Sequence, residues 1–229
     1  MQKQYVRSLF DSIAGRYDML NHLLSGGIDT YWRWRAIRRL SHGAPARILD
    51  VATGTADFAI AAARLGPREI VGVDLAWEML LRGRDKIARR GLAGVITLLA
   101  SEAEHLPFAE GAFDAAVVAF GVRNFEDLHQ GLAEMRRVLR AGGRLVVLEF
   151  SRPRVFPLRQ IYLFYFLRVI PLIGRLVSGN REAYTYLPES VMAFPEGADF
   201  LSLLAKAGFR SPGAERLTFG IASVYTAEK

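Results

Sequence analysis

A turn of small residues, followed at a fixed spacing by an acidic residue, is the feature of this sequence that most directly suggests chemistry. The turn, residues 50–57 (DVATGTAD), joins an apolar segment to an alanine-rich one, and small side chains there let a ligand approach the backbone. Asp74 follows Gly54 by 20 residues. In nucleotide-binding sheets an aspartate at this spacing accepts hydrogen bonds from ribose hydroxyls. The pattern favours a nucleoside site over its alternatives, an ordinary strand–helix turn and a helix-capping aspartate.

A parallel β-sheet is needed to bring these residues to one edge. From residue 47 onward, short apolar segments alternate with longer helical ones, which is typical of strands buried on both faces. The predicted strands are residues 47–52, 70–75, 95–100, 113–120 and 143–150, separated by predicted helices at 57–65, 77–90 and 127–139. Two further strands, at 216–219 and 221–226, predict a terminal antiparallel hairpin. The fold class is therefore α/β, with a mostly parallel sheet.

Composition narrows the class of protein. The chain has 229 residues, no cysteine, 51% hydrophobic residues and a formal net charge of +7. Such an apolar chain buries enough surface to fold, and without thiols it forms neither a disulfide scaffold nor a cysteine-ligated metal site. The first seven residues lack the apolar run of a signal peptide, so we expect a cytoplasmic protein. The positive charge suits a nucleic acid, an anionic membrane surface or an anionic small molecule.

The segment 155–177 interrupts the alternation of strands and helices. It is the longest apolar stretch of the chain, but it contains three arginines and an internal proline. Each central arginine costs about 2.5–3.5 kcal/mol on insertion scales, which argues against a membrane-spanning helix. We therefore expect this segment either to contact a membrane peripherally and line a tunnel, or to form an ordinary core or dimer surface.

Further motifs reveal a family resemblance. Residues 106–108 (LPF) precede the fourth predicted strand, and residues 137–143 (RVLRAGG) precede the fifth. With the turn and Asp74, residues 44–150 resemble the class I S-adenosylmethionine (SAM) methyltransferases, whose sheet is Rossmann-like with a terminal antiparallel strand. The rest of the chain is similar to the ubiquinone/menaquinone biosynthesis C-methyltransferases, and most like their demethylmenaquinone branch. The motifs are residues 10–18 (FDSIAGRYD), 21–28 (NHLLSGGI), 120–124 (FGVRN), 148–151 (LEFS) and 184–190 (YTYLPES).

This resemblance implies SAM as cofactor and no metal. By position, it implies cofactor contacts at Gly54, Thr55, Asp74, Glu102, Ala103 and Ala119. The chain departs from the family pattern in that alanine stands at positions 52 and 56, where many members have glycine. Glu102 stands where Asn or Asp is more common, and a carboxylate there can still accept from the adenine amino group.

The resemblance also implies transfer of a methyl group to a ring carbon of a prenylated quinol. Arg123 is expected to stabilise the phenolate that develops, with Asn124 orienting it. His22 and Tyr184 are the candidate proton acceptors. The alternatives are a salt bridge from Arg123 to Glu149 or Asp127, and a capping or packing role for His22.

We expect a single domain with four parts. These are an N-terminal helical lid (1–43), a SAM-binding core (44–150), a helical substrate or membrane insertion (151–195), and a C-terminal helix with strands (196–229). The expected partners are the quinol and, through 155–177, the inner face of a membrane. A homodimer is left open, and no nucleic acid is expected. The alternatives are methylation of another small molecule, a lipid or RNA, and a non-catalytic SAM-binding protein.

Overall fold

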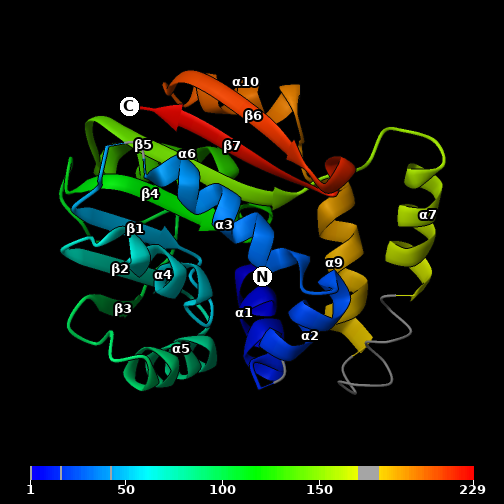
Figure 1. Ribbon diagram of the computed structural model, residues 1–229, viewed down its shortest axis with the longest axis horizontal. Helices are drawn as coiled ribbons and strands as arrows, with labels where there is room; N and C mark the ends of the chain where they lie inside the picture. Colours follow the sequence, from blue (N-terminus) through cyan, green and yellow to red (C-terminus); the bar gives the residue numbers. More distant parts are fainter. Residues whose placement is uncertain (1, 16, 42, 170–180) are drawn as a thin grey trace.

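A seven-stranded sheet forms the centre of the protein (Figure 1). The computed structural model describes residues 2–15, 17–41, 43–169 and 181–229. The order across the sheet is β3 (Ile96–Ala100), β2 (Glu69–Asp74), β1 (Arg47–Val51), β4 (Phe113–Ala119), β5 (Leu139–Phe150), β7 (Ala222–Glu228) and β6 (Arg210–Leu217). Strands β1 to β5 pair in parallel, whereas β7 pairs antiparallel with both β5 and β6. The predicted mostly parallel sheet with a terminal antiparallel strand is confirmed.

Helices cover both faces of the sheet, because the central strands are apolar on both sides. On one face, Ile48 and Val117 pack with side chains from α3 (Ile28–Leu40), α4 (Asp57–Ala62) and α5 (Trp77–Arg89). On the other face, Leu49 and Val118 pack with side chains from α6 (Leu128–Val138) and α10 (Ala198–Lys206). Successive residues of a strand thus pack into different cores, one on each face of the sheet. The two cores together fix the position of the strands.

Four helices gather beyond the ends of the parallel strands, from the lower centre to the right of Figure 1. They are α1 (Gln2–Ile13), α2 (Tyr17–Ser25), α7 (Leu158–Phe164) and α9 (Arg181–Ala193). Leu9 of α1 packs with Tyr162, Phe166 and Val191 in a separate small core, which joins α1 to the later helices. Ala14, after α1, packs with Ala76 and Met79 at the start of α5. The N-terminal helices and the segment after β5 therefore meet above the same edge of the sheet.

The last strands are longer than the sequence predicts. β6 begins at Arg210, six residues before the predicted start, and includes Ser211, Pro212 and Gly213. These residues have the composition of a turn. They are accommodated because β6 is the edge of the sheet, where a proline needs no partner for its missing N–H.

The expected insertion is only partly described. Residues 158–169 form α7 and a π-helical turn, Tyr165–Val169, and residues 170–177 of the predicted segment lie outside the described residues. In the part of the chain that the structure describes, no helix is both long and apolar enough to cross a membrane.

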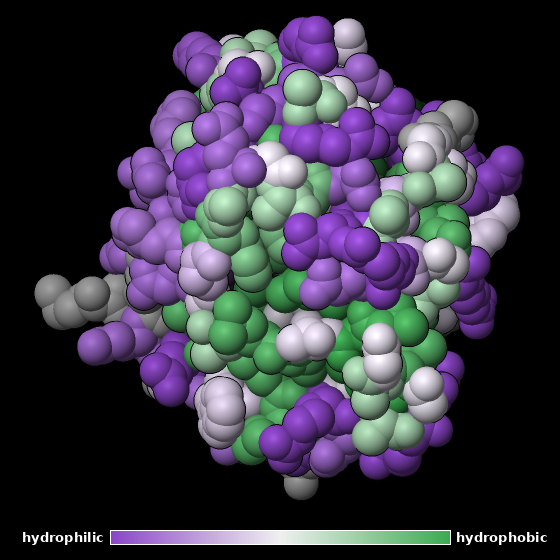
Figure 2. Space-filling model, turned by 90° about the vertical axis from the view of Figure 1, so that its left-hand side faces the viewer, coloured by the Kyte–Doolittle hydropathy of each residue, from purple (hydrophilic) through white to green (hydrophobic). Residues whose placement is uncertain are grey.

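Hydrophobic residues are exposed in more than one place on the surface. Tyr31 and Trp34 of α3, Trp77 of α5 and several residues around α7 are exposed. Figure 2 shows, on one side of the molecule, a band of hydrophobic residues across the lower half of the view with hydrophilic residues above and below it. Scattered exposed hydrophobic residues are normal for folded proteins, so exposure alone does not identify a docking surface here.

Candidate active site

The turn after β1 has the backbone shape that small residues favour. Ala52, Gly54 and Ala56 all have positive φ, at 54°, 56° and 63°. In this left-handed region a side chain clashes with the backbone, so it is usually occupied by glycine. A Cβ on Gly121, in the turn after β4, would lie 2.5 Å from the Cβ of Ala52. The two turns therefore approach closely, and together they form one end of a cleft.

Asp74 ties the same turn to the end of β2. One carboxylate oxygen, Oδ2, accepts a hydrogen bond from the N–H of Gly54 at 2.8 Å, and Oδ1 accepts one from the N–H of Ala76 at 2.8 Å. Burial raises the pKa of Asp74, and these backbone donors offset part of that rise. Each carboxylate oxygen has a second lone-pair site, so Asp74 is able to accept hydroxyl groups from a ligand as well.

The cleft lies between the carboxyl ends of the parallel strands and α1. Predicted site residues Gly54, Asp74, Ala103, Ala119 and Asn124 all line it. Glu102 does not; its carboxylate lies 3.4 Å from His105 Nδ1, and the buried Glu104 lines the cleft instead. The remaining lining residues are Val6, Arg7, Phe10, Tyr17, Ala52, Leu75, Ala76, Met79, Ser101, Phe120, Gly121 and Phe125.

A second cavity adjoins the first beneath the glycine turn. The two share Gly54 and Phe120 in their walls, and the second is lined in addition by Arg33, Asp50 and Thr55. Asp50 is buried; its Oδ2 accepts from Thr53 Oγ1 at 2.7 Å, while its Oδ1 has no hydrogen-bond partner among the described residues. Burial raises the pKa of Asp50 to about 7. The sequence shows its position at the end of a buried strand, but its unsatisfied oxygen was not predicted.

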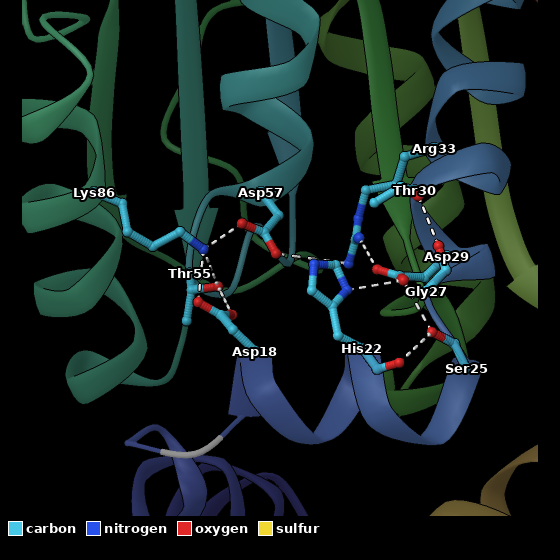
Figure 3. A network of polar contacts seen from close by, with 10 residues as sticks. All are labelled: Asp18, His22, Ser25, Gly27, Asp29, Thr30, Arg33, Thr55, Asp57 and Lys86. Carbon is cyan, nitrogen blue, oxygen red and sulfur yellow. Dashed lines mark hydrogen bonds and ion pairs between the residues drawn. The ribbon is translucent and has the colours of Figure 1, made fainter.

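Beside this cavity, charged side chains from four elements form a continuous polar network (Figure 3). Lys86 of α5 donates to Asp18 of α2 at 2.8 Å, to Thr55 at 3.1 Å, and to Asp57 of α4. Thr55 Oγ1 in turn donates to Asp18 at 2.6 Å. Thr55, predicted to contact the cofactor, is therefore fixed between the sheet and the second helix of the chain.

The other half of the network contains His22. Arg33 of α3 pairs with Asp29 and lies 3.8 Å from Asp57, while His22 Nδ1 lies 2.9 Å from Asp29 Oδ1. Burial alone would raise the pKa of Asp29, but Arg33, Ser25 and His22 together hold it below its ordinary value. His22 belongs to this network and is not among the residues that line the cleft.

The remaining predicted residues lie on the opposite side, at the ends of β4 and β5. Arg123 Nη1 donates to Glu149 Oε1 at 2.9 Å, so the salt bridge weighed as an alternative is present. Tyr186 of α9 donates to Asn124 Oδ1 at 3.0 Å. Tyr184 belongs to α9, but its side chain lies outside the described residues. The structure thus separates Arg123 and Asn124 from His22. In the described part of the chain, no group of His, Asp and Glu has the arrangement of a metal site.

Comparison with known proteins identifies the family. Residues 1–229 match the ubiE/COQ5 methyltransferase family. The chain belongs to this family. It is 46% identical over 229 residues to the demethylmenaquinone methyltransferase of Bacteroides fragilis, with 100% of this chain and 94% of that protein covered. It is 49% identical over 226 residues to the ubiquinone/menaquinone biosynthesis C-methyltransferase UbiE of Geobacter sulfurreducens, covering 98% and 88%. A similar relative is the demethylmenaquinone methyltransferase of Thermus thermophilus, 48% identical over 222 residues, covering 96% and 100%.

Solved structures show the same fold at low sequence identity. A SAM-dependent methyltransferase of Thermotoga maritima, described as a possible histamine N-methyltransferase, superposes with a TM-score of 0.66 at 19% identity, covering 97% of this chain and 99% of that one. A putative SAM-dependent methyltransferase of Methanococcus maripaludis gives 0.66 at 19%, covering 96% and 94%. The predicted family, fold class, methyltransferase activity and SAM cofactor are confirmed for this member of the ubiE/COQ5 family.

Proposed function

We propose that this methyltransferase transfers a methyl group from SAM to a ring carbon of a prenylated quinol, with demethylmenaquinol as the foremost acceptor. The names of its relatives support this substrate class. The observation that carries the proposal is the composition of the cleft. It holds nucleoside-binding elements, Gly54 and Asp74, on one wall and Asn124, bound to α9, on the other. Such a cleft accommodates a donor and an acceptor side by side.

The cofactor fits the residues present. Asp74 is proposed to accept the ribose hydroxyls, and Gly54, where a Cβ would project into open space, leaves room for the nucleoside. The unsatisfied Oδ1 of Asp50 and the guanidinium of Arg33 line the second cavity. They are proposed to receive the ammonium and carboxylate groups of the methionine end, respectively. Further proposed contacts are Thr55, Ala103, Ala119 and, in place of Glu102, Glu104, which lines the cleft.

The chain's own residues are proposed to prepare the acceptor. SAM supplies a methyl group that is already activated on its sulfonium, so the protein has to align the reactants and exclude water. A quinol carbon becomes nucleophilic when the neighbouring hydroxyl loses its proton. Arg123 is buried and is not among the residues that line the cleft, so it is proposed to stabilise the phenolate from behind the turn to which the carbonyl of Phe120 ties it, while Asn124, which lines the cleft, orients the ring. Tyr184 and His22 remain the proposed proton acceptors. Because His22 is held by Asp29 and does not line the cleft, the quinol proton is proposed to reach it through an intervening group.

Transfer of labelled methyl groups tests the acceptor class directly. Purified enzyme is given labelled SAM with demethylmenaquinol in detergent or, separately, with RNA or a sterol. We expect label in the quinol fraction alone. Label in RNA or the sterol, with none in the quinol, would contradict the proposal.

A matched pair of aspartates tests the cofactor assignment. Each hydrogen bond to a charged group contributes about 1.5–3 kcal/mol, so Asp74→Ala is expected to weaken SAM binding about ten- to a few hundred-fold. Asp114, at the start of β4, also accepts two backbone N–H groups, from Ala46 and Arg47. Asp114→Ala should therefore lower stability while leaving SAM affinity unchanged. Equal SAM affinity in the two folded variants, measured by calorimetry, would remove Asp74 from the site.

Peripheral membrane contact is proposed for the segment around α7. This segment is distinguished by three exposed arginines interspersed with exposed apolar side chains: Arg154, Val155, Phe156, Arg159, Ile161, Phe164, Leu167 and Arg168. Such a surface suits anionic lipid headgroups with apolar side chains below them. A homodimer through the same face is the competing proposal, and sedimentation of the free enzyme at twice the monomer mass would support it.

Vesicle binding distinguishes a lipid contact through α7 from nonspecific adsorption through any exposed hydrophobic residue. Ile161→Ser with Phe164→Ser should reduce co-sedimentation with anionic vesicles, and added salt should do the same to the wild type. Phe166 belongs to the predicted segment 155–177, but it is buried in the small core with Tyr162, so it is not part of the test. The matched control is Trp77→Ser, because Trp77 is exposed on α5. A loss of binding as large in the control as in the α7 variant would contradict the lipid contact.

A further inference from the structure

Glu149 is a buried carboxylate to which the proposed chemistry gives no role. It lies near the end of β5 with 0% of the residue exposed. Burial raises its pKa, and the neighbouring charge of Arg123 opposes the rise. Only one of its oxygens is used: Oε1 accepts from Arg123 and from the N–H of Phe150 at 2.8 Å, while Oε2 has no hydrogen-bond partner among the described residues. A buried ion pair is often less stable than an apolar pair of the same volume, so stability alone does not account for Glu149.

Arg123 links Glu149 to three parts of the cleft region. Besides Glu149, it donates through Nη1 to the carbonyl of Phe120 and through Nε to Ser190 Oγ of α9 at 3.2 Å. Its guanidinium also lies 5.5 Å from the ring centre of Phe150. One side chain thus connects the ends of β4 and β5 with α9, and Glu149 fixes its orientation.

The residue whose carbonyl Arg123 holds has an unfavourable backbone conformation. Phe120 has a φ of 57°, in the left-handed region that bulky side chains avoid. Such conformations persist where the surrounding structure enforces them, and they are frequent at functional sites. Phe120, Gly121 and Asn124 all line the cleft, so the strained turn is also the wall of the site.

We infer that Glu149 is a positioning residue for methyl transfer, which, through Arg123, holds the strained turn 120–124 in the shape that the cleft requires. The inference rests on the proposed function for its kinetic readout, but it has a second readout that needs no acceptor. Trp32 is buried, with its ring centre 6.0 Å from that of Phe120 and 6.1 Å from that of Phe150. Its fluorescence therefore reports a movement of the turn.

Glu149→Gln tests the inference, because it removes the charge and keeps the shape. The variant is made in the wild type for kinetics, and in a Trp34→Phe, Trp77→Phe background for fluorescence, since both of those tryptophans are exposed. A misplacement of about 1 Å is sufficient to lower turnover about 100-fold. We expect kcat to fall about 10- to 100-fold, SAM affinity to change less than about 3-fold, and the Trp32 emission to change.

The matched control is Glu134→Gln on α6. Glu134 forms an ion pair with Arg137 and accepts from the N–H of Leu106, and it does not line the cleft. This control should lower stability and leave both kcat and Trp32 emission unchanged. Glu149 would be merely structural if Glu149→Gln behaved as the control does. A loss of kcat with unaltered emission, or an equal loss of SAM affinity, would also overturn the inference.

Two provisions keep the test decisive. If Glu149→Gln does not fold, Glu149→Asp replaces it, because aspartate keeps the charge but withdraws the carboxylate by one methylene. Loss of kcat with changed emission then supports the inference, and an unchanged kcat overturns it. If the wild type methylates no quinol, the proposed function fails, and the fluorescence comparison of Glu149→Gln with Glu134→Gln alone decides the role of Glu149.

Discussion

Two charged clusters flank the cleft, and they differ most in their contact with water. On the acceptor side, the side chains of Arg123 and Glu149 are 4% and 1% exposed. On the side proposed for the cofactor, those of Lys86, Asp57 and Asp18 are 19%, 31% and 40% exposed, whereas Arg33 and Asp29, in the other half of that network, are 12% and 5% exposed. The first pair joins strand ends within the core, whereas the second group joins helices across a partly solvated surface (Figure 3). Removing one partner of an ion pair is therefore expected to lower stability by different amounts on the two sides.

The difference follows from the local dielectric. Removing one member of a buried pair leaves the other as an uncompensated charge, which costs about 3–5 kcal/mol. Exposed pairs are screened and contribute about 0–1 kcal/mol each. We therefore expect the stability contribution of the Arg123–Glu149 pair to be insensitive to salt, and that of the Lys86 group to decrease as salt is added.

The largest effect on stability is expected from Arg123→Ala. It leaves Glu149 buried without its cation, so the free energy of unfolding should fall by about 3–5 kcal/mol. Denaturant titrations at low and high salt measure this loss, which should be the same in both because the pair is shielded from ions. A loss below about 1 kcal/mol, or one that disappears in salt, would place the pair with the exposed cluster instead.

Asp50, between the two clusters, should make stability depend on pH. Its pKa is about 7 in the folded protein against an ordinary value of 3.8. Between these values the folded state keeps a proton that the unfolded state has released, so stability falls as pH rises from about 4 to 7 and is then constant. The full change is on the order of 4 kcal/mol, at about 1.4 kcal/mol per pH unit.

Asp50→Asn should remove most of that slope and stabilise the free protein above pH 7. The same substitution should weaken SAM binding, because the amide cannot receive an ammonium group as a carboxylate does. Thermal unfolding from pH 4 to 8, with and without SAM, measures both effects. Parallel pH profiles for the wild type and the variant would show that Asp50 does not titrate in this range.

The smallest effect on stability is expected from Lys86→Met. Lys86 bridges Asp18, Thr55 and Asp57, but at a partly exposed site. Its loss should lower the free energy of unfolding by about 1 kcal/mol at low salt and by less at high salt. The contrast with Arg123→Ala is the point of the measurement. A salt-independent loss of about 3 kcal/mol or more would show that Lys86 is also part of a buried pair.

Local sequence features predicted the sheet, the glycine turn and Asp74, because strand periodicity and the βα turn are properties of neighbouring residues. The network around Lys86 was not predictable in this way. On the sequence, Lys86 belongs to a charged helix face that resembles any solvated one, and its partners Asp18 and Asp57 are 68 and 29 residues away. Glu104 lines the cleft where the sequence predicts Glu102, and this was not predictable either, because the direction of a loop side chain depends on tertiary packing.

Arg123 and Glu149 illustrate the opposite case. Both were visible in motifs of the sequence, and their ion pair was weighed as an alternative to catalysis. The structure shows the pair and, in addition, the strained Phe120 that it holds. A salt bridge and a functional role are therefore compatible at this position, and the sequence alone presents them as competitors.

The division of labour between the two clusters is tested most directly by the dissociation constant of SAM, measured by calorimetry on Arg123→Lys and Lys86→Met under identical conditions. Arg123→Lys keeps the charge and should bind SAM within about 2-fold of the wild type, although its kcat falls, because the planar fork is lost. Lys86→Met should bind SAM about 5-fold or more weakly, equivalent to about 1 kcal/mol, because Thr55 and α2 lose their common partner. Weakened SAM binding in Arg123→Lys with unchanged binding in Lys86→Met would contradict the account.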